Sequence, residues 1–162
     1  MTNHAIRKEY FFCPWQNKFI FLSFDGENYQ SMESSKYSHR FTHGLANYKE
    51  KALAVGCSNT YADCSRATEI FDMNTLNWSD GPDFPFGSKS SSISGYSTAK
   101  TPDAAYIIGG GDPPFEYLNL VAEFRNNQWT QLNDLNKGRL HHGSITVGAQ
   151  TMIVGGSSSG TK

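Results

Sequence analysis

The chain has 162 residues and a formal net charge of −1, and it contains 15 glycines, 11 phenylalanines, 8 tyrosines and 3 tryptophans. A nearly neutral chain offers no basic field for nucleic acid and no polybasic patch for an anionic membrane, and no window approaches the roughly 18 consecutive apolar residues of a membrane span. Aromatic, glycine-rich and weakly charged sequences favour strands joined by tight turns, in one all-β domain.

The first 17 residues are assigned to an N-terminal lead-in. The stretch "MTNHAIRKEYFFCPWQ" has a basic cluster but no continuous apolar region before a cleavage site, so we expect no signal peptide and favour an intracellular location over secretion. Cys57 and Cys64 could form a disulfide in an oxidising compartment, which would leave Cys13 over. Without a signal sequence, three free thiols are the favoured interpretation.

A first landmark recurs in residues 18–162. "RFTHG" at residues 40–44 matches "RLHHG" at residues 139–143, and each is followed by an apolar segment that ends near a glycine, Gly56 or Gly156. The segment "AAYIIGGG" supplies a further glycine doublet at residues 109–110. Such glycines permit sharp turns and a close approach of neighbouring backbones.

A second landmark has the same phase. "TEIFDMNTLNW" ends at Trp78 and "VAEFRNNQW" ends at Trp129, 51 residues later, and "FLSFDGENY" fits the same template with Tyr29 in place of tryptophan. Two landmarks with a shared period near 50 indicate a repeated supersecondary unit.

Each unit is predicted to contain four short strands. The expected elements are third and fourth strands at 18–32, complete blades at 40–80 and 87–132, and first and second strands at 139–156. In the middle unit "SKSSS" at Ser88–Ser92 stands where the R-x-x-H-G motif should fall, and the stretch "SGYSTAKTPDA" is interpreted as an insertion before the second strand.

This pattern of a glycine doublet followed by an aromatic strand and a tryptophan resembles the kelch repeat, over about residues 18–162. The resemblance implies β-propeller blades, each a four-stranded antiparallel sheet. Joining the two chain ends gives three blades, which is too few for an ordinary closed ring, so the expected architecture is a partial or incomplete ring. The chain would then be part of a longer protein, an open arc, or half of a homodimer that completes six blades.

Catalytic and metal sites are not expected. His43 and His142 are equivalent positions of the repeat, and no H-x-x-x-H or H-E-x-x-H spacing is present. "IGGGDPP" lacks the P-loop pattern and a following helix, and no G-x-S-x-G elbow occurs. We therefore expect no cofactor.

The expected function is non-catalytic binding of a protein or peptide partner through the loops on the faces of the propeller. The candidate contact residues are Arg40, Tyr61, Lys89, Asp112, Phe115, Arg139 and His141. For the two arginines a hydrogen bond within the repeat is favoured over a ligand contact. The alternative function is a secreted galactose-oxidase-like enzyme or a fragment of a carbohydrate-binding propeller, with Cys57 and Cys64 bridged.

Overall fold

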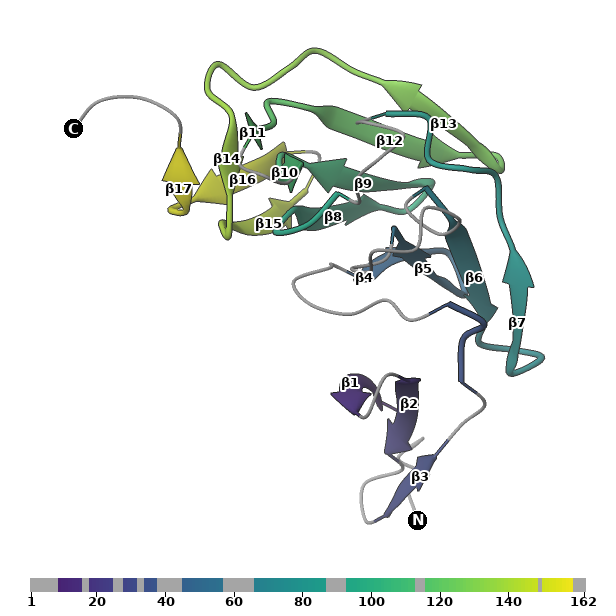
Figure 1. Cartoon of the computed structure of the whole chain (residues 1–162). Coiled ribbons are helices and arrows are strands. Elements are labelled where there is room, and N and C mark those ends of the chain that lie inside the picture. Colours follow the sequence, from purple (N-terminus) through teal and green to yellow (C-terminus); the bar gives the residue numbers. More distant parts are fainter. Residues whose placement is uncertain are drawn as a thin grey trace, which may run out of the picture.

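A computed structural model describes residues 9–15, 18–24, 28–31, 34–37, 45–56, 66–86, 93–112, 116–148 and 150–158. Every regular element in these ranges is a strand, all the strand pairs are antiparallel, and none of the ranges contains a helix (Figure 1). Within the described part of the chain there is accordingly no helix that could span a membrane. The expectation of an all-β chain is confirmed.

Two four-stranded sheets form the centre of the molecule, and we call them blade A and blade B. Blade A consists, in order, of β4 (Leu45–Tyr48), β5 (Lys51–Val55), β6 (Thr68–Asp72) and β7 (Asn77–Asp80). Blade B consists of β8 (Ser97–Thr101), β9 (Ala104–Ile108), β12 (Val121–Arg125) and β13 (Gln128–Gln131). A short hairpin of β10 (Gly111–Asp112) and β11 (Glu116–Tyr117) interrupts blade B between its second and third strands. These sheets are the propeller blades that the repeat predicts.

Smaller sheets lie at the two ends of the described chain (Figure 1). The N-terminal sheet contains β1 (Glu9–Trp15), β2 (Lys18–Phe24) and β3 (Tyr29–Ser31). At the other end β15 (Gly143–Val147) and β16 (Gln150–Val154) form the C-terminal hairpin, and β14 (Arg139–Leu140) pairs with β17 (Ser157–Ser158). The blades follow one another along an open arc, so the ring is partial.

Strand β1 lies inside the region assigned to the lead-in. Its sequence, EYFFCPW, is rich in aromatic residues, which favour strands. Pro14 has no N–H to donate, but β1 is the edge strand of its sheet, where proline is tolerated. The repeat landmarks begin only at β2, which is why the repeat pattern did not reveal this strand.

The cross-strand register confirms the second sequence landmark. In each of three sheets a phenylalanine of one strand lies directly opposite an aromatic residue of the next strand: Phe24 with Tyr29, Phe71 with Trp78, and Phe124 with Trp129. Opposite residues in an antiparallel pair share a face of the sheet. In blade B this is the leading face, by which we mean the face turned toward the preceding blade, and the other face is the trailing face.

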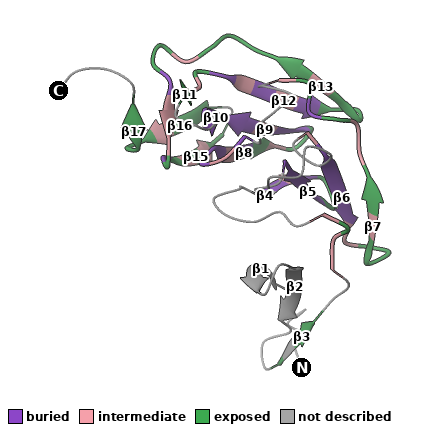
Figure 2. Cartoon of the chain, viewed as in Figure 1, coloured by how far each residue is buried: buried purple, intermediate pink, exposed green. Residues whose placement is uncertain are grey.

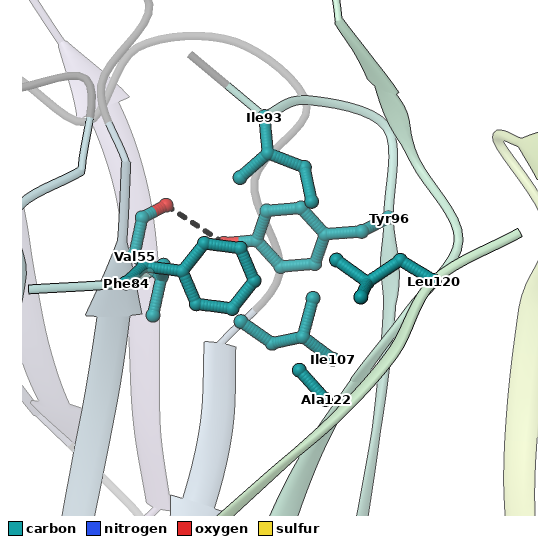
Figure 3. Close-up of a cluster of buried hydrophobic side chains, with 7 residues drawn as sticks. All are labelled: Val55, Phe84, Ile93, Tyr96, Ile107, Leu120 and Ala122. Carbon is teal, nitrogen blue, oxygen red and sulfur yellow. Dashed lines mark hydrogen bonds between the residues drawn. The ribbon is translucent and has the colours of Figure 1, made fainter. Parts of the chain in front are cut away.

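The main core lies between the trailing face of blade A and the leading face of blade B. Phe84 is fully buried and lies edge-to-face with Trp129, their ring centroids 5.0 Å apart. Around Phe84 the core continues through Ile107 and Leu120 (Figure 3). Tyr96 points into this cluster and its hydroxyl donates a hydrogen bond of 3.0 Å to the Val55 carbonyl at the end of β5.

The structure corrects the interpretation of the middle unit. Two features align the middle unit with the last unit. Ser94 forms a bridge to Gly111, as Leu140 pairs with Ser157. The residues that follow, Gly95 and His141, both have positive φ. The counterpart of "RLHHG" is therefore "ISGYS" at residues 93–97, and "SKSSS" stands outside the motif. The presumed insertion contains β8, the first strand of blade B. In this unit Tyr96 replaces the motif histidine, which hid the motif from the sequence comparison.

The glycine doublets are explained by what lies against them. A Cβ on Gly109 would lie 2.7 Å from Cε1 of His142, which begins the next unit, and one on Gly110 would lie 3.1 Å from Cβ of Tyr96 in its own blade. Both glycines also have positive φ. The doublet thus makes room for the start of the first strand both in its own blade and in the next blade.

Candidate functional site

The first strands of three successive units lie side by side, because β8 contacts both β4 and β15. A cleft of about 300 Å³ runs along them. It is lined by Asn47, Thr98, Ala99, Lys100, Ser144, Ile145 and Thr146. We call this surface the inner cleft.

A second hollow of about 280 Å³ lies at the turns that follow these strands. It is lined by Lys49, Lys100, Thr101, Pro102 and Gly148. Because Lys100 lines both hollows, we treat them as one site that reaches from the inner strands to the turns at one end of the blades.

Strand alternation explains why polar side chains line the inner cleft. In β8 the side chains of Ser97 and Ala99 are buried, whereas Thr98 is half-buried and Lys100 is exposed. Successive side chains of a strand point to opposite faces, so Thr98 and Lys100 share one face. The hydroxyl of Ser144 donates a hydrogen bond of 2.6 Å to the Thr98 carbonyl, which fixes β15 against β8.

The charge of the site comes from two lysines. Among the described residues neither Lys49 nor Lys100 forms an ion pair, whereas Lys51 lies 3.9 Å from a carboxylate oxygen of Asp72. The Lys49 ammonium lies 5.1 Å from the ring centroid of Tyr48, at cation–π distance. Asp103 follows Pro102 in the same turn but lines neither hollow.

Tyr48 is anchored beside this charge. The backbone N–H of Asn126 donates a hydrogen bond of 3.2 Å to its hydroxyl oxygen. This bond, more than the nearby Lys49 charge, lowers the pKa of Tyr48, against the opposing effect of burial. Tyr48 lines neither hollow, and its buried ring belongs to the interface with blade B.

The residues proposed from the sequence lie elsewhere. Arg139 belongs to β14, where its carbonyl accepts a hydrogen bond from the Gly110 N–H and its guanidinium donates one of 3.2 Å to the Gly155 carbonyl. His141 is exposed, and its N–H donates to the Gly95 carbonyl. Neither residue lines the inner cleft or the hollow at the turns.

Asp112 lies in β10 opposite Glu116, and nothing further is described for its side chain. The other candidates fall outside the described residues: Arg40, Tyr61, Lys89 and Phe115, together with Cys57 and Cys64.

His142 is a buried residue of the repeat, and its pKa is lowered. Burial, and after it the positive charge of Arg139, lowers the pKa of His142, and a smaller contribution from the Ile108 backbone opposes them. Neither ring nitrogen has a hydrogen-bond partner of good geometry among the described residues. Those residues also include no cluster of three or more histidine, cysteine or acidic side chains placed to bind a metal.

Six residues of the site were not predicted from the sequence: Asn47, Lys49, Thr98, Lys100, Ser144 and Thr146. A signal was present, since "LANYK", "STAK" and "GSIT" place polar residues at alternate positions of otherwise apolar first strands. That signal became readable only once the first strand of blade B was located at residues 97–101.

No family model matches the sequence, and no curated protein matches it. Solved structures do resemble it, and one of them is described as "Structure of YjhT". This β-propeller superposes with a TM-score of 0.69 at 16% sequence identity, over 87% of this chain and 46% of the other chain. The chain thus spans about half the length of that structure. A likeness at this identity establishes the fold, and the chain is an all-β array of propeller blades.

Proposed function

We propose that this chain belongs to a kelch-type propeller that binds a protein or peptide partner without catalysing a reaction. The glycine doublets and the repeated phenylalanine–aromatic pairs support the kelch assignment. The partner would be recognised at the inner cleft, by side chains presented from adjoining blades.

The observation that carries the proposal is the pair of lysines at this site. Lys49 and Lys100 lie next to hydroxyl and amide side chains and have no acidic partner within ion-pair distance among the described residues. Ammonium groups form their strongest hydrogen bonds with carboxylates or phosphates. A segment rich in aspartate or glutamate is the ligand that this chemistry favours.

The rigidity of the scaffold also supports binding. The lining strands are fixed by the Ser144–Thr98 hydrogen bond and by the packing of Ala46 and Tyr48 against blade B. A preformed site loses less conformational entropy when a ligand binds.

The test uses a fluorescein-labelled peptide of alternating glutamate and serine, compared with its lysine–serine counterpart, and fluorescence anisotropy. We expect the acidic peptide to bind with an affinity that falls as salt is added. The double variant Lys49→Gln/Lys100→Gln should weaken binding about tenfold or more, since a charged hydrogen bond contributes about 1.5 kcal/mol.

Lys137→Gln is the matched control because Lys137 is exposed and lies outside the site. It should leave the affinity unchanged. Equal binding of both peptides, or an equal loss in the control and the double variant, would contradict recognition of carboxylates by this cleft. Absence of binding by the acidic peptide would also count against it.

We further propose that two copies of the chain associate. The surface that would join them includes neither Lys49 nor Lys100, although it shares Ile145 with the inner cleft.

A further inference from the structure

The C-terminal hairpin carries an apolar face that no described residue covers. Ile145 is 55% exposed, Val147 61%, Met152 55% and Val154 62%. Ile145 lies directly opposite Met152, so these side chains share one face of the hairpin. Figure 2 shows the exposed positions of β15 and β16 at the end of the arc. We call this surface the bare face.

The bare face is the trailing face of an incomplete blade. Gly155 and Gly56 each follow the second strand of their unit. When these two glycines are aligned, Met152 stands at the position of Leu53, and Val154 at that of Val55. The cross-strand pairs then place Ile145 at the position of Ala46. In blade A these positions are at most 1% exposed.

In blade A the same positions are covered by the next blade. Leu53 and Ala46 pack in one cluster with Ala105 and Phe124 of blade B, and Trp129 lies against it. The side chains of the bare face are therefore of the kind that packs, in blade A, against a phenylalanine–aromatic pair on the leading face of the next blade.

The glycine at the end of the hairpin gives a second, independent sign of a missing neighbour. Gly109 ends β9 at a position where an added Cβ would meet His142 of the next unit. Gly155 ends β16 in the same way, with φ +74°, yet nothing lies within 4 Å of an added Cβ among the described residues. Space that blade B fills with the next unit is open here.

The outer edge of the hairpin is also unpaired. Among the described strands β16 pairs with β15 alone, whereas β5 pairs with β4 and β6, and β9 pairs with β8 and β12. Open strand edges combined with an apolar face favour association with another sheet.

We propose that the N-terminal sheet of a second copy of this chain covers the bare face, and that the reciprocal contact is made at the other end of the pair. The N-terminal sheet has the required register, because Phe24 lies opposite Tyr29 as Phe124 lies opposite Trp129. Among the described strands none precedes β1 in the chain.

The lengths agree with a closed pair. This chain covers 46% of the propeller to which it was compared, so two copies together approach the length of one such chain. The two contacts are identical, so a twofold arrangement covers both bare faces. The proposal specifies the surfaces of the association proposed above, and it does not depend on the peptide-binding activity.

The first experiment measures the mass of the purified full chain by light scattering after size exclusion. We expect twice the chain mass of 18.0 kDa. Ile145→Glu/Met152→Glu should give the mass of one chain with an unchanged circular dichroism spectrum, because both side chains are exposed within one copy. Should that variant fail to fold, Val154→Lys tests the same face.

Leu132→Glu is the matched control. Leu132 is 39% exposed and lies outside the bare face, so this variant should keep the doubled mass. A folded wild-type chain with the mass of one copy would overturn the proposal, and the bare face would then be covered by further blades of a longer chain or by another protein. A ladder of larger species would also overturn it, because the pair would not be closed.

Hydrogen exchange identifies the occupant. If the N-terminal sheet lies on the bare face, Ile145→Glu/Met152→Glu should speed amide exchange in β1–β3 as well as in β16. Faster exchange in the hairpin alone would show two hairpins packed on each other, which contradicts the proposed arrangement. Because the readouts are mass and exchange, a failure here would leave the peptide proposal intact, and a failure of peptide binding would leave this one intact.

Discussion

Leu53 and Met152 occupy the same position in two units of one repeat, yet Leu53 is fully buried whereas Met152 is 55% exposed. The same contrast separates Gly109, whose missing Cβ leaves room for His142, from Gly155, where no described residue lies within 4 Å of an added Cβ. The difference arises from the neighbouring unit, since blade B covers blade A and no described blade covers the hairpin. In an array of repeats each unit is stabilised largely by contacts with its neighbours, so a sequence position suited to burial becomes buried only when the next unit is present.

The largest expected effect separates Leu53 from Met152. Leu53→Ala should lower the free energy of unfolding by about 2–5 kcal/mol, because it leaves a cavity between the blades. Met152→Ala should change it by no more than about 0.5 kcal/mol in a background carrying Ile145→Glu, where the proposed association is broken. Urea denaturation measures both values. Equal losses would mean that the hairpin side chain is buried within one copy, which would contradict the comparison.

The next comparison sets Gly109 against Gly155. Both have positive φ, so alanine at either position incurs the left-handed strain of about 1–2 kcal/mol. At Gly109 the new Cβ would also lie 2.6 Å from the Arg139 carbonyl oxygen and 2.7 Å from His142, which should add about 1–3 kcal/mol through overpacking.

Denaturation of Gly109→Ala and Gly155→Ala in the Ile145→Glu background measures the difference between these glycines. Gly148→Ala serves as the control for strain alone, since its φ of +62° is close to the +63° of Gly109 and no described residue lies within 4 Å of an added Cβ. If Gly109→Ala were no worse than Gly148→Ala, the packing of His142 would contribute nothing to the doublet.

The sequence predicted the architecture of the repeat because its landmarks are required by backbone geometry and by core packing. Gly109 and Gly110 must have positive φ, and Phe124 must meet Trp129 across two strands, so these residues are recognisable in isolation. The motif around Tyr96 was not recognised, because this unit has tyrosine where the other units have histidine. From that position the Tyr96 hydroxyl donates a hydrogen bond to the Val55 carbonyl.

The candidate site was harder to find than the fold. Lys49 and Lys100 belong to different blades and adjoin the same site only because β4 and β8 lie next to each other. Exposed lysines are common on any surface, so neither one indicates a site by itself. Arg139 and His141 were proposed as contact residues because they belong to the repeated motif. In the structure they form hydrogen bonds to backbone groups of the repeat.

The smallest expected effect distinguishes His142 from Tyr96, which immediately precede the equivalent strands β15 and β8. Burial lowers the pKa of His142, so the folded chain binds less proton at this site near pH 6 than the unfolded chain does. The stability that depends on neutral His142 is complete above about pH 6.5, the ordinary pKa of histidine, and declines as the pH falls below it.

The substitution His142→Tyr gives the last unit the residue that blade B has at this position, Tyr96, and removes the titrating imidazole. Urea denaturation between about pH 5 and 8 should therefore show a smaller loss of stability on acidification for His142→Tyr than for the original chain. His141→Gln is the matched control, because His141 is exposed and should leave the acid-induced loss unchanged. An identical pH dependence for His142→Tyr and the original chain would mean that His142 is accessible to protons in the folded state, and that its contact with Gly109 is looser than the close approach of the two units requires.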